Sequence, residues 1–178
     1  YKEDPRLIES DATSQYHISV NMQNPDNPIL GNLNFRKALY YGTDREAVAA
    51  AGNSIPAWWI QPQMVVGNLE TGEKYRDMMA EAHPEWVPEN YAYDPEAAVE
   101  YFNTALEETG LDSVTLTLLY SSDNSRYKTC SEYLQKAWAE LFGADRFTLE
   151  IQGMPNSQMT ATKKDWVNNP SSYDLGWG

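Results

Sequence analysis

"VTLTLLY" (Val114–Tyr120) and "FTLEIQG" (Phe147–Gly153) flank the stretch "RYKTCSEYLQKAWAELFG" (Arg126–Gly143). The two flanking runs are rich in strand-forming residues, whereas apolar residues recur at helical spacing between them. A second amphipathic stretch, residues 157–167, leads into "SYDLGWG", which predicts a third strand over 172–177. This alternation of strands and helices predicts a parallel βαβαβ core with right-handed crossovers.

A well-marked helix precedes the first of these strands. Asp94 is placed to cap it, Pro95 suits the first helical position, and Gly110 is placed to end it. The spacing therefore predicts a helix over 95–109. We expect this helix and the one over 125–142 to pack on the parallel core.

The N-terminal third contains a strand and two short helices. "YHISVNM" (Tyr16–Met22) alternates apolar and polar residues, which predicts a half-buried strand in the same sheet or at its edge. "LNFRKALYYGTDREAV" (Leu33–Val48) predicts two helices in tandem. Asn34 is expected to cap the first, and Thr43 with Glu46 forms a capping box for the second.

The region that follows is irregular. It is rich in proline, glycine, tryptophan and methionine, with a short predicted helix over 73–82, and we expect Trp58, Trp59 and Trp86 to hold it on the surface. The chain is predicted to form one domain of three parts: residues 14–52 with the strand and tandem helices, the excursion 53–92, and the βαβ core 93–178.

The charge balance and the missing motifs limit the function classes. The net charge of −13 opposes binding to nucleic acid or anionic lipid, and no apolar run has the length of a membrane span. There is no phosphate-binding loop, no zinc-spaced histidine pair and no Gly-x-Ser-x-Gly sequence, and no cofactor or metal is predicted. A binding module is therefore favoured over an enzyme. The alternative is a small α/β hydrolase or transferase that uses clustered carboxylates.

Cys130 is the only cysteine. A single thiol excludes an internal disulfide and a multi-thiolate metal site. Cys130 shares a helical face with Leu134 and Trp138, which predicts a buried structural thiol.

Ligands of parallel-sheet proteins approach the carboxyl ends of the strands. These ends are here "SSDNSR" (Ser121–Arg126), "GMPNS" (Gly153–Ser157) and "GWG" (Gly176–Gly178). The first offers hydroxyls, an amide and a guanidinium that could hold a peptide backbone or a carboxylate. The alternative is that Ser122, Asp123 or Asn124 only caps the following helix.

Three stretches together resemble the extracellular solute-binding proteins of ABC peptide importers, the oligopeptide- and dipeptide-binding group. "NFRKALYYGTDREAV" (Asn34–Val48) is similar to the family's Arg-x-Ala-Leu helix followed by an Asp-Arg-Glu helix. "YAYDPEAAVEYFNTAL" (Tyr91–Leu106) is similar to its Tyr-Asp-Pro-Glu-x-Ala helix. The tail, residues 114–178, follows its strand and helix order.

The resemblance implies an α/β, periplasmic-binding-protein-like lobe. Complete members of the family are longer, with two lobes that close over the ligand, and this chain resembles most of the second large lobe. Arg36 belongs to a scaffold helix in the family, so a structural role is expected for it. Asp44 and Glu46 are favourably placed at a helix N-terminus, so neither needs a catalytic role.

The resemblance also implies a set of ligand contacts. Ser121, Ser122 and Asn124 match polar residues after the strand, and Arg126 matches a basic residue at the start of the helix. An aromatic residue often follows the next strand in the family, and Met154 stands there instead. Trp177 matches the family's Gly-Trp segment, and the aspartate that grips the peptide amine would lie beyond residue 178.

The function that the resemblance implies is the capture of extracellular oligopeptides for import. The implied partners are an oligopeptide and the membrane permease of an ABC importer, with no nucleic acid, and the fragment is expected to be monomeric. The implied location is extracytoplasmic, either lipid-anchored at the outer face of the membrane or periplasmic. Relatives that bind nickel chelates or sugars keep those ligands open as alternatives.

Overall fold

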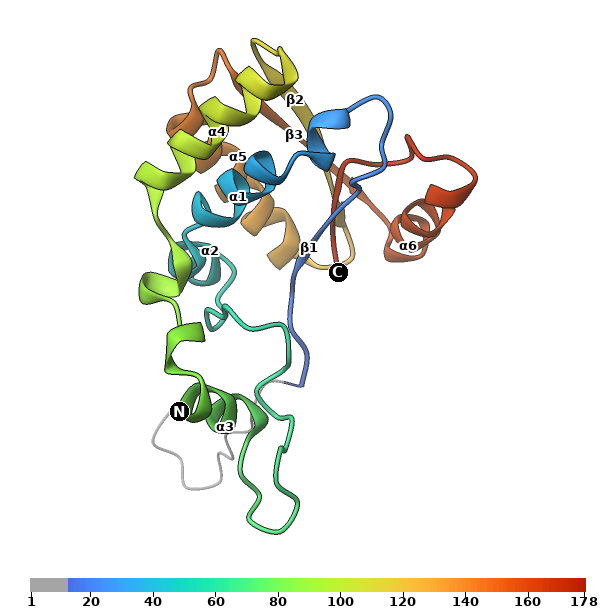
Figure 1. Ribbon diagram of the computed structural model, residues 1–178. Coiled ribbons are helices and arrows are strands. Elements are labelled where there is room, and N and C mark those ends of the chain that lie inside the picture. The colour runs from blue at the N-terminus through green and yellow to red at the C-terminus, as the bar shows by residue number, and fades with distance from the viewer. Residues whose placement is uncertain (1–12) are drawn as a thin grey trace.

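The computed structural model describes residues 13–178 (Figure 1). Its strands are β1 (Ile18–Val20), β2 (Val114–Ser121), β3 (Phe147–Met154) and β4 (Leu175–Trp177). Its α-helices are α1 (Leu33–Tyr41), α2 (Arg45–Ala51), α3 (Tyr75–Ala82), α4 (Pro95–Thr109), α5 (Ser125–Phe142) and α6 (Asn156–Lys164). Short 3-10 turns lie at Pro28–Gly31, Pro84–Trp86, Glu89–Ala92 and Asp165–Val167.

The four strands form one sheet in the order β1-β4-β2-β3. β2 is parallel to β3 and to β4, which confirms the predicted parallel core. β1 pairs antiparallel with β4, with Ile18 opposite Trp177, so the N-terminal strand forms the edge of the same sheet as expected. β4 begins at Leu175 and is therefore shorter than the strand predicted over 172–177.

Helices cover both faces of the sheet. Figure 1 places α1, α4 and α5 on one side and α6 on the other. On the first side, Leu134 and Trp138 of α5 are buried against strand residues that include Leu116 and Leu149. On the second side, Met159 of α6 packs with Leu119 and Met154.

Helix α4 packs mainly against α1 rather than directly on the sheet. Its Phe102 ring lies 6.2 Å from the Phe35 ring of α1 and 6.1 Å from the Phe147 ring of β3. The N-terminal helices therefore form part of the layer that covers the core. This arrangement joins the first and last thirds of the sequence in one hydrophobic core.

The ends of α4 agree with the sequence signals, but the caps of the tandem helices do not. Asp94 accepts a hydrogen bond from Ala97 N, and the helix ends at Gly110, which has a left-handed backbone. α1 is capped by Asn32, whose side chain accepts from Phe35 N, so the prediction of Asn34 is wrong.

The prediction of a capping box at Thr43 is also wrong. Asp44 caps α2, with its Oδ1 2.9 Å from Ala47 N. The Thr43 hydroxyl donates instead to the carbonyl oxygen of Leu39, 2.6 Å away. Asp44 competes successfully for the cap because a carboxylate gains more than a hydroxyl from a helix N-terminus.

The alternation of burial predicted for the first strand is wrong, because Ile18, Ser19 and Val20 are all partly buried and Tyr16 is 40% exposed. Beyond Val20, Asn21 is buried and Met22 is exposed, the reverse of the predicted order. Asn21 is buried because its side-chain amide forms hydrogen bonds: Nδ2 donates to the carbonyl oxygens of Pro170 (2.7 Å) and Tyr173 (2.9 Å). These bonds tie the end of β1 to the segment before β4.

Asp174 is a second buried polar residue at this junction. Its Oδ1 accepts from Asn24 Nδ2 (2.7 Å) and Asn27 Nδ2 (2.8 Å), and its Oδ2 accepts from Thr117 N (2.8 Å). The carboxylate therefore joins the loop after β1 to β2 and to the start of β4. It fixes the position of the strand that ends in Trp177.

Arg36 has the structural role expected of it. Its Nη1 donates to the carbonyl oxygens of Leu30 (3.1 Å) and Gly31 (2.7 Å), which lie in the 3-10 turn before α1. The guanidinium thus satisfies backbone acceptors at the end of that turn. This explains a basic residue near the start of a helix, where the dipole alone disfavours it.

The excursion 53–92 extends away from the sheet, in the lower part of Figure 1. The three tryptophans contact one another within the excursion: the Trp59 ring lies 4.6 Å from Trp58 and 6.3 Å from Trp86. α3 lies within the helix predicted over 73–82. None of the helices in residues 13–178 combines the length and apolar character needed to cross a bilayer.

Candidate functional site

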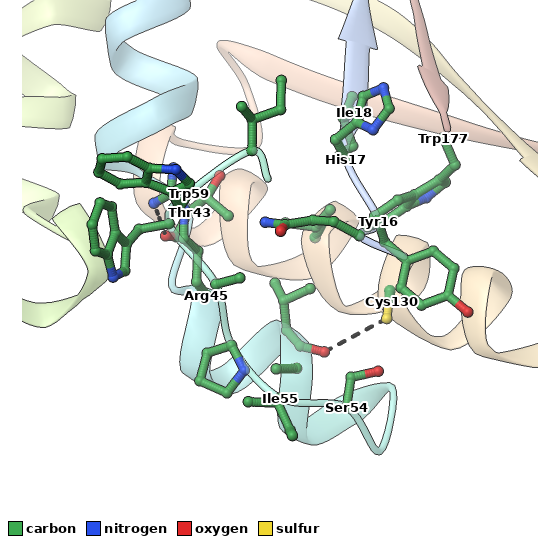
Figure 2. Close-up of a pocket in the computed structure, with 18 of the residues that line it drawn as sticks. Tyr16, His17, Ile18, Thr43, Arg45, Ser54, Ile55, Trp59, Cys130 and Trp177 are labelled. Atoms are coloured by element: carbon green, nitrogen blue, oxygen red, sulfur yellow. Dashed lines mark hydrogen bonds between the residues drawn. The ribbon is translucent and has the colours of Figure 1, made fainter. Parts of the chain in front are cut away.

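A cleft of about 720 Å³ lies beside the edge of the sheet. One wall is made by β1, the end of β4 and the first turns of α5, and the other by α1, α2 and the segment 54–60. Figure 2 shows Tyr16, Cys130 and Trp177 on the first wall, and Thr43, Arg45 and Trp59 across from them. Ser54 and Ile55 lie at the lower side of this view.

The first wall is built from aromatic side chains. The Tyr127 ring lies 5.1 Å from the Tyr16 ring, edge to face, and 5.6 Å from the Trp177 ring. Trp177 is fixed because its Nε1 donates to Ser131 Oγ, 2.8 Å away. Arg126 extends this group: its guanidinium carbon lies 5.8 Å from the Tyr16 ring centroid.

Arg45 anchors the second wall. Its Nη1 donates to the carbonyl oxygens of Tyr40 (3.1 Å), Thr43 (3.2 Å) and Tyr91 (2.8 Å). Its guanidinium also lies over the Tyr40 ring, 4.3 Å from the centroid. Burial lowers the pKa of Arg45, and the nearby Tyr40 opposes that effect.

Cys130 lies on the first wall of the cleft and is buried, as the helical face predicted. Its Sγ lies 3.5 Å from the carbonyl oxygen of Val48. Burial raises the pKa of the Cys130 thiol, and the positive charge of Arg126 only partly opposes this. The thiol therefore lacks the low pKa that a nucleophilic cysteine needs.

The outer edge of β1 borders the cleft. His17 exchanges two backbone hydrogen bonds with Gly178, at 3.1 and 2.9 Å. In an antiparallel pair the next residue directs its backbone groups the other way, so Ile18 N and O point away from β4. Within residues 13–178 no strand pairs with that side of β1. The cleft thus combines aromatic walls with an open strand edge.

The residues proposed from the sequence fall into two groups in the structure. Arg126 and Trp177 line the cleft. Ser121, Ser122, Asn124 and Met154 lie at the ends of β2 and β3, outside the lining.

The second group has local partners of its own. Ser121 and Met154 are buried, and Ser122 N donates to the carbonyl oxygen of Met154, 2.8 Å away. Asn124 caps α5, with its Oδ1 accepting from Arg126 N at 3.0 Å.

Sequence reasoning missed much of the cleft. Tyr16 and Ile18 were predicted only as strand residues, Arg45 only as part of a helix, and Trp59 only as a surface anchor. The one available signal was the position of β1 at a sheet edge, which did not reveal what faces it. In the described part of the chain, no group of three or more His, Cys, Asp or Glu residues is placed to hold a metal ion.

Comparison with protein families gives a match along the whole chain. Residues 1–178 match the family described as bacterial extracellular solute-binding proteins, family 5, in its middle region. The chain belongs to this family. The predicted resemblance is therefore confirmed, and members of family 5 are binding proteins for solutes outside the cytoplasm. No curated protein matches the sequence.

Solved structures similar to this family 5 chain confirm the predicted fold. OppA of Listeria monocytogenes, bound to peptide, has a TM-score of 0.77 at 18% identity, over 99% of this chain and 32% of its own. The substrate-binding domain of an oligopeptide ABC transporter from Bacillus anthracis has a TM-score of 0.74 at 22% identity, over 94% and 30%. OppA of Burkholderia pseudomallei has a TM-score of 0.67 at 16% identity, over 95% and 29%.

The present chain spans about a third of the length of these proteins. At these identities the likeness concerns the fold: an α/β lobe with a mostly parallel sheet, as in periplasmic binding proteins.

Proposed function

We propose that this chain forms most of the second large lobe of a receptor that captures oligopeptides outside the cytoplasm. The receptor delivers them to the membrane permease of an ABC importer, and it performs no catalysis. It acts either as a lipid-anchored protein at the outer face of the membrane or in the periplasm. The family match and the fold shared with peptide-bound OppA support this proposal.

The observation that carries the peptide assignment is the open edge of β1 beside an aromatic cleft. An extended peptide can pair with a free strand edge through its backbone, which gives affinity without dependence on sequence. Ile18 offers backbone groups on that side, and Arg126 and Trp177 lie close by on the same wall. Side chains of the peptide would enter the cleft, whose volume leaves room for varied residues and for water.

Residues outside the cleft complete the proposed site. Ser121, Ser122, Asn124 and Met154 would meet a part of the ligand that extends past the ends of β2 and β3. The aspartate that pairs with the peptide amine would come from the rest of the receptor.

The test is a calorimetric titration of the longer receptor with a neutral pentapeptide. We expect saturable binding in the micromolar range or tighter. The same peptide, N-methylated at alternate backbone amides, loses donors needed for strand pairing and should bind at least about tenfold more weakly. Failure to bind any peptide, together with binding of a nickel chelate or a sugar, would contradict the assignment.

The lobe by itself should bind peptides poorly. A two-lobe receptor buries its ligand between the lobes, so this chain supplies only part of the contacts. Those contacts must first offset roughly 4 kcal/mol or more for lost translational and rotational freedom. Titration of residues 1–178 alone should therefore show no saturable heat up to millimolar peptide. Micromolar binding by this chain would mean that it contains a complete site.

A further inference from the structure

Among residues 13–178, the charges that line the cleft are all of one sign. The chain carries 26 acidic and 13 basic residues, yet the described residues of the cleft lining include no aspartate or glutamate. The lining does include four arginines: Arg36, Arg45, Arg76 and Arg126. An acidic protein thus has a positively charged cleft.

Among the described residues, the hydrogen-bond acceptors of the four arginines are neutral, so no hydrogen-bonded carboxylate cancels their positive charge. Arg36 and Arg45 donate to backbone carbonyl oxygens, as described above. Arg76 donates through Nε to the carbonyl oxygen of Gln61 (2.7 Å) and through Nη2 to Gln15 Oε1 (2.6 Å). A carbonyl satisfies a donor without cancelling the charge of the guanidinium.

Arg126 has the most donors to spare. Its hydrogen-bond acceptor in the described chain is the Tyr16 hydroxyl, at 3.4 Å. A guanidinium has five N–H donors, so most of those on Arg126 remain open to a ligand. Burial lowers the pKa of Arg76 more than the neighbouring Asp77 raises it, which agrees with a partly desolvated cation at the other end of the cleft.

Two tryptophans of the lining add further donors. The indole Nε1 atoms of Trp59 and Trp138 are buried and have no hydrogen-bond acceptor in the described residues. Such groups are costly to leave unpaired, and they suit an acceptor rather than a donor. The described lining of the cleft therefore offers N–H groups and positive charge and contains no acidic acceptor for a cationic ligand.

We infer that the receptor selects neutral and acidic peptides and rejects basic ones, because the side chain that enters this cleft must be an acceptor or apolar. A peptide carboxylate would gain charge-assisted hydrogen bonds from Arg126. A lysine or arginine side chain would be desolvated next to like charges. This inference rests on the proposed function and adds the class of peptide.

The test uses three pentapeptides that differ only in a central Glu, Gln or Lys, titrated into the longer receptor at low salt. The Glu peptide should bind at least about tenfold more tightly than the Lys peptide, with Gln between them. The difference should shrink as salt is added. If the Gln peptide binds but the Glu and Lys peptides bind with equal affinity, the inference on charge fails. If none of the three binds, the proposed function fails instead.

Variants show whether the cleft is the source of the preference. Arg126→Gln should reduce the Glu-to-Lys ratio by several-fold. Lys128→Gln is the matched control: it removes the same charge from α5, but Lys128 is exposed and pairs with Glu132 on the surface, outside the cleft lining. It should leave the ratio within about twofold. Equal effects of the two variants would assign the preference to net charge and overturn the inference.

Discussion

Removal of the Asp174 carboxylate should destabilise the lobe strongly. Asp174 is only 6% exposed, and Asp174→Ala removes the acceptor of Thr117 N, of Asn27 Nδ2 and of one N–H of Asn24. Asn24 Nδ2 keeps only its longer bond to the carbonyl oxygen of Tyr173, at 3.2 Å. A buried unpaired donor costs about 1–3 kcal/mol. Asn27 is less buried than Asn24 and can regain water, so we expect a total loss of about 3 kcal/mol, a large share of the 5–15 kcal/mol typical of a domain.

The assay is urea unfolding of residues 1–178, in which tryptophan fluorescence monitors the fraction of unfolded protein. Asp174→Ala should lower the midpoint with little change in the slope. Asp26→Ala is the control, because this substitution removes the same charge from the same loop. Asp26 differs from Asp174 in being exposed. It should change the unfolding free energy by less than about 0.5 kcal/mol. A loss below about 1 kcal/mol for Asp174→Ala would refute the reasoning that the carboxylate satisfies these donors.

Three further predictions concern the helices. Asn32→Ala should lower the free energy of unfolding in urea by about 1 kcal/mol, because it removes the cap of α1. Asn34→Ala loses only exposed hydrogen bonds to Glu108 and should lower it less, and the reverse order would mean that Asn34 is the cap. Native Cys130 should react slowly with a thiol reagent at neutral pH and fully in denaturant, and rapid native labelling would contradict its burial. Gly52→Ala should destabilise, because the added Cβ would lie 2.6 Å from Cys130 Sγ, and Cys130→Ala should relieve that cost in the double variant.

The parallel core could be predicted because its signals are local. β2 and β3 are rich in strand-forming residues, with a helical repeat between them. α4 carries its own start and stop residues, Asp94 and Gly110. Each of these signals lies within the element that it specifies. No distant contact was needed to find them.

The caps of α1 and α2 could not be predicted in the same way. Asn32 and Asn34 are equally good candidates by residue type. Glu108, more than 70 residues away, accepts from the side-chain amides of both, so this contact does not choose between them. The 3-10 turn Pro28–Gly31 ends directly before Asn32 and leaves Asn32 with the extended backbone of a cap, and that turn has no clear signal in the sequence.

The cleft was only partly predictable because its walls come from distant parts of the chain. Arg126 and Trp177 could be found because the carboxyl end of a parallel strand is a general ligand position. Tyr16, Arg45 and Trp59 reach the same cleft through the edge pairing of β1 and the packing of the excursion. Neither of these leaves a periodic signal in the sequence.

The opposite signs of the chain and its cleft act over different distances. At physiological salt, exposed charges are screened beyond about 8 Å, so the net charge of −13 has little effect on a peptide that already lies in the cleft. Arg126 and Arg76 act at contact, where partial desolvation strengthens their attraction for a carboxylate. The acidic surface therefore governs the approach of a peptide, and the cleft governs which peptide stays. It follows that selectivity for acidic peptides should appear mainly in the dissociation rate, since the cleft contacts form only after the peptide has arrived.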